Sequence, residues 1–267
     1  MPRVSLGGVN FNYEERGTGQ PVVFIPGLWM SARFFKRQME GLGDRYRVVA
    51  FDLRAHGQSD HVQAGHTMTQ YARDLKAFLE RLQLNDVVLA GWSMGAFVIW
   101  DYFKQFKGER VKATIVIDQS ASDFKWPDWP YGFADLPTLA HLMATVQMDR
   151  DGFVPGFLPN LFKNPPSETE LAWMVEEACR LPVSIAASVF FDQTVRDYRP
   201  VLPSVNVPTL LTFGRDEKLV PVAAGEHLQQ NLPNAKLVIF EQSGHCPFLE
   251  EPERFNAEVD SFVRSLG

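Results

Sequence analysis

Apolar runs and amphipathic segments alternate along most of the chain. Runs rich in β-branched residues predict six buried strands, at residues 21–26, 46–52, 86–92, 112–118, 208–214 and 235–241. Between these runs, apolar residues recur at helical spacing, as in the series Tyr71, Leu75, Phe78, Leu79 and Leu82. This alternation predicts an α/β protein with a mostly parallel sheet that is covered by helices on both faces.

The pattern changes at the N-terminus and again in the second half of the chain. Residues 4–15 predict an antiparallel hairpin ahead of the first parallel strand. Between residues 120 and 203 the strand pattern is lost, and helical patterns cover residues 137–148, 167–180 and 183–198. We therefore expect a core domain of residues 1–119 and 204–267, with residues 120–203 inserted as a helical cap.

Composition narrows the class of protein. The 267 residues are 45% hydrophobic, which is enough for a sizeable core, and their formal net charge is -6. This charge argues against a nucleic-acid partner, because no basic surface is available to replace the counterions of phosphates. The chain shows neither the apolar region of a secretory signal nor a membrane-spanning apolar run, so we expect a cytoplasmic protein with no membrane partner. The oligomeric state is left open.

The two cysteines, Cys179 and Cys246, are too few for a disulfide framework. Neither has a second Cys or His at metal-ligand spacing. We expect two free thiols, no metal and no cofactor.

The segment Gly91-Trp-Ser-Met-Gly95 directly follows the apolar run at residues 86–90. The ends of parallel strands border the crevice in which ligands bind, and Ser93 stands at such an end. A serine in a tight strand-to-helix turn needs small neighbours two residues away, which Gly91 and Gly95 supply. The pattern predicts an exposed nucleophilic hydroxyl at Ser93, although a serine that only caps the next helix is an alternative.

A serine nucleophile needs a base, and the base needs a third group that holds its tautomer. His245 follows the last predicted strand and is expected above the same sheet edge as Ser93. His56 also follows a strand, but its turn-like context indicates a structural or pocket-lining role. The other four histidines fall at positions expected to be solvated, namely His61, His66, His141 and His227.

Three acids compete for the third position. Asp216 and Glu217 are adjacent after the penultimate strand, and Asp118 ends the strand that follows the nucleophile's strand. For Asp118, a carboxylate that caps the next turn is the simpler interpretation. The oxyanion of a tetrahedral intermediate needs two convergent N–H donors, and we expect these from Met94 and from Leu28, in the glycine-containing loop after the first parallel strand.

Five motifs in order make the chain resemble the α/β-hydrolase superfamily, in particular its haloperoxidase-like and esterase-like members and their lactonase relatives. These are P-G-L (26–28), D-L-R-A-H-G-Q-S-D (52–60), G-W-S-M-G (91–95), G-R-D-E-K-L-V-P (214–221) and S-G-H (243–245). The resemblance implies an α/β-hydrolase fold and a catalytic set of Ser93, Glu217 and His245. It places the acid on Glu217 rather than Asp216, with Glu in place of the more usual Asp.

Two departures from the family pattern stand in the oxyanion loop. Pro26 replaces the common histidine, and Trp29 stands where many haloperoxidase-like members have proline, which argues against perhydrolysis. Residues 120–203 are rich in aromatic and methionine side chains, most of which are expected to bury the cap itself. We expect the substrate pocket to be lined by Trp29, Trp92, Trp126 and Phe133.

An apolar roof above Ser93 favours a small-molecule substrate with an acyl chain or ring. The leading interpretation is a serine hydrolase that cleaves a carboxylic ester or lactone, acyl-homoserine lactones included, through an acyl-enzyme on Ser93. Carbon–carbon bond hydrolases and cofactor-free hydroxyquinolone dioxygenases share the scaffold and are alternatives. A non-enzymatic binding protein is a further alternative of another class.

Overall fold

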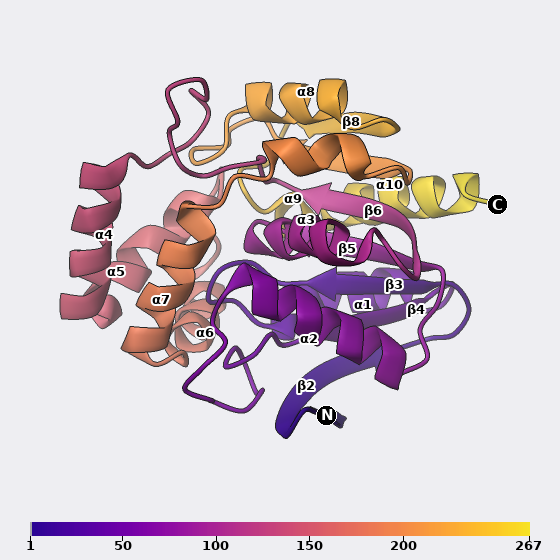
Figure 1. Cartoon of the computed structure of the whole chain (residues 1–267), viewed down its shortest axis with the longest axis horizontal. Coiled ribbons are helices and arrows are strands. Elements are labelled where there is room, and N and C mark those ends of the chain that lie inside the picture. Colours follow the sequence, from indigo (N-terminus) through magenta and orange to yellow (C-terminus); the bar gives the residue numbers. More distant parts are fainter. Residues whose placement is uncertain (1) are drawn as a thin grey trace.

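The computed structural model describes residues 2–267 and has an eight-stranded sheet at its centre (Figure 1). The strand order is β1-β2-β4-β3-β5-β6-β7-β8. The strands are β1 (Arg3–Leu6), β2 (Val9–Arg16), β3 (Pro21–Ile25), β4 (Arg47–Phe51), β5 (Val87–Trp92), β6 (Val111–Ile117), β7 (Thr209–Gly214) and β8 (Ala235–Phe240). Strands β3 to β8 pair in parallel, whereas β1 and β2 form the antiparallel part of the sheet. The predicted fold class and hairpin are thereby confirmed.

The central parallel strands β3 and β5 are apolar along their whole length because both sheet faces are covered. In β3, Val23 and Ile25 belong to one buried cluster, and Val22 and Phe24 belong to another on the opposite face. The first cluster is covered by α2 (Met68–Arg81), α3 (Met94–Phe106) and α8 (Val222–Asn231). The second is covered by α1 (Lys36–Leu42), α9 (Pro247–Glu250) and α10 (Pro252–Ser265).

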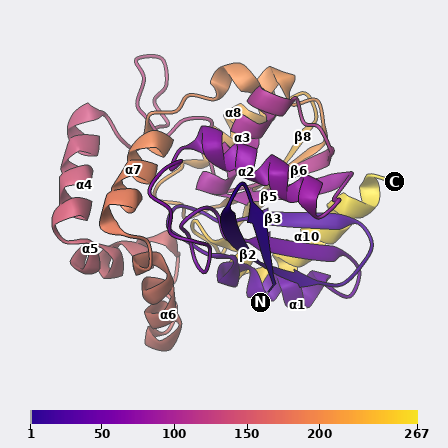
Figure 2. The same ribbon diagram turned by 60° about the horizontal axis from the view of Figure 1, so that its bottom comes forward.

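The segment between β6 and β7 is helical. It contains α4 (Leu136–Met148), α5 (Arg150–Phe157), α6 (Glu168–Cys179) and α7 (Val183–Thr194), with short 3-10 turns at Leu158–Leu161 and Arg199–Ser204. Figures 1 and 2 show these four helices together at one end of the molecule, away from the C-terminus. The domain boundaries expected from the sequence remain a prediction.

Two details of this segment differ from the sequence prediction. Helix α5 was not expected, because Pro155 lies inside it and its eight residues are too few for a clear periodic pattern. Helix α7 ends at Thr194 instead of continuing to residue 198. No helix within residues 2–267 has the length and apolar character needed to cross a membrane.

Candidate active site

Ser93 occupies a strained turn between β5 and α3. Its backbone angles are φ 50° and ψ -119°, a conformation that residues other than glycine rarely adopt. A Cβ atom at Gly91 would lie 2.5 Å from the carbonyl carbon of Gly95, so the spacing of the two glycines has a direct steric cause. The Ser93 side chain makes no capping hydrogen bond to α3, which argues against the helix-cap alternative. Instead, Ser93 lines a cavity.

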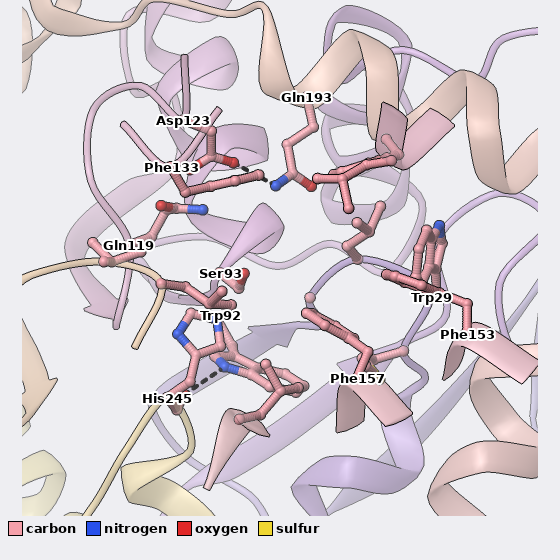
Figure 3. Close-up of a pocket in the computed structure, with 18 residues that line it drawn as sticks. Trp29, Trp92, Ser93, Gln119, Asp123, Phe133, Phe153, Phe157, Gln193 and His245 are labelled. Carbon is pink, nitrogen blue, oxygen red and sulfur yellow. Dashed lines mark hydrogen bonds between the residues drawn. The ribbon is translucent and has the colours of Figure 1, made fainter. Parts of the chain in front are cut away.

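His245 lines the same cavity as Ser93 and is held on several sides. Its Nδ1 lies 2.7 Å from Glu217 Oε2. Its backbone N–H donates to the carbonyl of Leu161 at 2.8 Å, and its own carbonyl accepts from Trp92 Nε1 at 2.9 Å. A hydrogen bond at Nδ1 leaves the other ring nitrogen, Nε2, free to act on the cavity contents. The Ser93 and His245 side chains can be followed in Figure 3.

The structure separates the two adjacent acids after β7. The side chain of Glu217 is 1% exposed, and its Oε1 accepts from the backbone N–H groups of Leu219 and Val220. Asp216 points elsewhere, because its carboxylate is half-exposed and pairs with Lys163 Nζ at 2.7 Å. Of these two, Glu217 is therefore the partner of His245.

Asp118 is a second buried carboxylate beside the same imidazole. Its Oδ1 lies 3.6 Å from His245 Nδ1, and its Oδ2 accepts from the backbone N–H of Gly214 at 2.7 Å. Within the described part of the chain, Oδ1 has no hydrogen-bond partner. The atoms that Asp118, Glu217 and His245 offer lie within 4.8 Å of one another, a grouping that could also hold a cation.

The ionisation of the three groups is linked. Burial, followed by the charge of Glu217, raises the pKa of Asp118. Burial opposes ionisation of Glu217 as well, but the charge and hydrogen bond of His245 outweigh it, so the pKa of Glu217 is lowered. Burial by itself would lower the pKa of His245, yet the two adjacent carboxylates raise it. The cluster therefore favours ionisation of Glu217 over ionisation of Asp118.

The loop after β3 lies directly against the nucleophile's turn. A Cβ atom at Gly27 would lie 3.3 Å from the Ser93 Cβ, so this glycine permits the close approach of the loop. Leu28 follows it, and both residues line the cavity. Met94 is the first residue of α3, and its N–H is one of the four that have no acceptor within the helix. The expected oxyanion role of Leu28 and Met94 remains a prediction.

The histidines that the sequence set aside fall into two groups. His56 is 1% exposed, its Nδ1 lies 3.0 Å from the carbonyl of Arg54, and burial lowers its pKa to about 4, which indicates a structural role. The expectation that His66 is solvated is wrong, because it is buried with Nε2 2.7 Å from the Val62 carbonyl. His227 is also partly buried, against Trp129, whereas His61 and His141 are exposed.

The cavity has a volume of about 270 Å³ and is mostly apolar. Trp29, Trp92 and Phe133 line it, as the sequence predicts. Trp126 is a correction, since it is not among the lining residues and its indole N–H instead donates to Ser122 Oγ at 2.9 Å. The expected aromatic lining comes largely from other residues of the inserted segment, namely Phe153, Phe157 and Phe190.

Three polar lining residues were missed by the sequence analysis, namely Gln119, Asp123 and Gln193. Gln119 lies two residues after β6, and the rule that ligands bind at carboxyl ends of parallel strands could have indicated it. Asp123 and Gln193 are 70 residues apart, and no local pattern connects them.

Comparison with known proteins identifies the family to which this fold belongs. The model of the alpha/beta hydrolase family matches residues 22–258. The AB hydrolase superfamily protein YisY of Bacillus subtilis is 30% identical over 256 residues, which is 94% of each chain. The pimeloyl-[acyl-carrier protein] methyl ester esterase of Nitrosomonas europaea is also 30% identical, over 94% of this chain and 99% of its own. An esterase structure from Exiguobacterium antarcticum has a TM-score of 0.92 at 27% identity and covers 96% of both chains. The chain belongs to the alpha/beta hydrolase family.

Proposed function

We propose that this protein is a serine hydrolase that cleaves a carboxylic ester or lactone with an apolar acyl chain through an acyl-enzyme on Ser93. The observation that carries the proposal is the His245–Glu217 hydrogen bond of 2.7 Å beside a cavity that both His245 and Ser93 line. Nucleophile, base and orienting acid are the three parts of a serine hydrolase site. The esterases among the similar proteins support the same reaction class.

Each residue then has one task. Glu217 accepts from His245 Nδ1 and keeps Nε2 as the basic nitrogen. His245 Nε2 takes the Ser93 proton as Oγ attacks the acyl carbon, and the N–H groups of Leu28 and Met94 stabilise the oxyanion. His245 returns the proton to the leaving alkoxide, and then activates a water that releases the acid from Ser93.

The inserted segment supplies much of the wall around the acyl chain. Leu142 lies on α4, Phe153 and Phe157 lie on α5, and Phe190 lies on α7, and all four line the cavity. These side chains favour an apolar acyl group over a charged one. We propose that residues 120–203 act as the cap of a core made from residues 1–119 and 204–267.

The decisive experiment replaces Ser93 by alanine and measures hydrolysis of p-nitrophenyl butyrate. We expect kcat to fall on the order of 10⁴- to 10⁶-fold, because the nucleophile is lost while the cavity remains. Ser265→Ala, in the exposed last turn of α10, is the matched control and should keep the parent rate. A Ser93→Ala protein that hydrolyses the ester at the parent rate would contradict the proposal.

A covalent probe and a substrate panel complete the test. A dialkyl p-nitrophenyl phosphate should transfer its dialkyl phosphoryl group to the Ser93 oxygen of the parent protein with release of p-nitrophenolate, as seen by intact mass, and should not add to Ser93→Ala. A panel of esters, acyl lactones and hydroxyquinolones, with products identified by mass, separates hydrolysis from ring cleavage. Turnover of the quinolones alone would replace hydrolysis with the dioxygenase alternative.

A further inference from the structure

One part of the otherwise apolar cavity is polar. Gln119, Asp123 and Gln193, here called the polar corner, line this part and lie in the same close-up as Ser93 (Figure 3). They are 1%, 2% and 4% exposed, so their polar atoms are largely shielded from solvent. They come from two elements, since Gln119 and Asp123 follow β6 and Gln193 lies on α7.

Hydrogen bonds within the polar corner fix the direction of the Gln193 amide. Its Nε2 donates to Asp123 Oδ2 at 2.6 Å, so its Oε1 is the atom left over. Throughout residues 2–267, this buried Oε1 finds no donor. A buried carbonyl oxygen without a donor is unfavourable, and a ligand N–H or O–H would satisfy it.

The carboxyl of Asp123 holds the Gln193 amide in this orientation. Burial raises the pKa of Asp123 to about 7, against the lowering effect of hydrogen bonds from Gln193 and Gln119. Gln119 Oε1 accepts from the backbone N–H of Ser120 at 2.7 Å, which fixes the orientation of this amide. The unpaired carbonyl oxygen of Gln193 is therefore the acceptor that the corner offers to a ligand, and an ionised ligand carboxylate has no proton to donate to it.

We propose that the polar corner binds a neutral hydrogen-bond donor of the substrate, an amide N–H or a hydroxyl, through Gln193 Oε1, while Asp123 holds the Gln193 amide in place. The inference rests on the proposed function and narrows the substrate class to esters or lactones whose apolar part carries one such donor. Phe153, Phe157 and Phe190, which line the cavity, would contact the apolar remainder of the substrate. Substrates without the donor leave the Gln193 carbonyl unpaired and bind less tightly.

Binding to the Ser93→Ala protein tests this inference without turnover. Calorimetry compares N-ethylhexanamide with N-ethyl-N-methylhexanamide, which has the same chain but no N–H. We expect the secondary amide to bind about 10-fold more tightly, because its N–H forms one additional buried hydrogen bond. In Ser93→Ala with Gln193→Met, the two amides should bind equally, because the acceptor is gone. Phe157→Leu is the matched control, which should weaken both amides and keep their ratio.

Two results would overturn the inference, namely equal affinity of the two amides for Ser93→Ala, or an N–H preference that survives Gln193→Met. Should the Gln193 variant fail to fold, the parent protein decides the question with p-nitrophenyl 6-hydroxyhexanoate against p-nitrophenyl heptanoate, which have equal numbers of heavy atoms. A higher kcat/KM for the hydroxy ester supports the inference, and equal values contradict it. Failure of the proposed function is seen separately, as unchanged hydrolysis by Ser93→Ala.

Discussion

The two buried carboxylates beside His245 permit a quantitative test by a double-mutant cycle. Glu217 Oε2 lies 2.7 Å and Asp118 Oδ1 lies 3.6 Å from His245 Nδ1. Burial and the charge of Glu217 raise the pKa of Asp118, so we expect Asp118 to hold a proton while Glu217 is ionised. When Glu217→Gln removes that charge, Asp118 should ionise in its place and support the imidazolium.

The distances give the size of the expected loss. Moving the negative charge from 2.7 to 3.6 Å weakens its attraction to an imidazolium by about 1.5 kcal/mol at an effective dielectric constant of about 20. The weaker hydrogen bond adds about 1 kcal/mol. Glu217→Gln should therefore lower kcat/KM roughly 10²-fold. Asp118→Asn replaces a carboxyl that we expect to be protonated with a neutral amide, and should change kcat/KM about threefold or less. Loss of both carboxylates should cost about 10⁴-fold, the usual loss when a catalytic histidine has no acid partner.

The assay is kcat/KM for p-nitrophenyl butyrate in the parent, the two single variants and the double variant, with thermal unfolding as the check on folding. A double variant far worse than the product of the single effects supports a shared role of the two acids. A double variant no worse than Glu217→Gln refutes the replacement of one charge by the other. Complete loss of turnover in Asp118→Asn alone would instead make Asp118 the orienting acid.

Three further predictions concern pH, backbone and cavity. The two carboxylates raise the pKa of His245, and the base must be neutral, so kcat/KM should fall as pH falls through that pKa. The variant without both carboxylates should move this limb of the pH–rate profile to lower pH, and an unmoved limb would contradict the assignment. Gly91→Ala should destabilise the protein by about 3 kcal/mol or more in a denaturant titration, because the new Cβ meets the Gly95 backbone at 2.5 Å. Gly156→Ala lies in α5 and meets nothing within 4 Å, so as the control it should be neutral or stabilising by up to about 1 kcal/mol. Leu142→Trp fills part of the cavity and should lower kcat/KM for p-nitrophenyl octanoate relative to the acetate about 10-fold, whereas an unchanged ratio would show that the acyl chain lies elsewhere.

Local sequence patterns were sufficient to place a residue in the fold wherever its position follows from the strand that precedes it. Ser93 is such a case, because the two glycines, the preceding apolar run and the following helix all lie within one short segment. Helix α5 is the opposite case, since it has only eight residues and contains Pro155, so its local sequence gives no clear helical pattern.

Neither the sequence alone nor the structure alone singles out Glu217 among the three acids. Resemblance to a family favoured Glu217 over Asp216, and the structure adds the reason, since Asp216 forms an ion pair with Lys163 at the surface. The closeness of Asp118 to the same imidazole is a consequence of β6 and β7 being neighbours in the sheet. The order of elements along the sequence does not show that these two strands are adjacent, because more than 80 residues separate them.

By itself, the sequence determined the order of strands and helices, the parallel core, and the segments from which a nucleophile and a histidine emerge. Those features follow from periodic burial and from the steric needs of one turn, which are properties of contiguous residues. The tertiary structure alone decided that Trp126 lies outside the cavity, that Asp118 shares the imidazole with Glu217, and that Asp123 and Gln193 meet. These are contacts between segments distant along the chain, and they depend on how the helices between β6 and β7 pack over the sheet edge, for which no local pattern carries information.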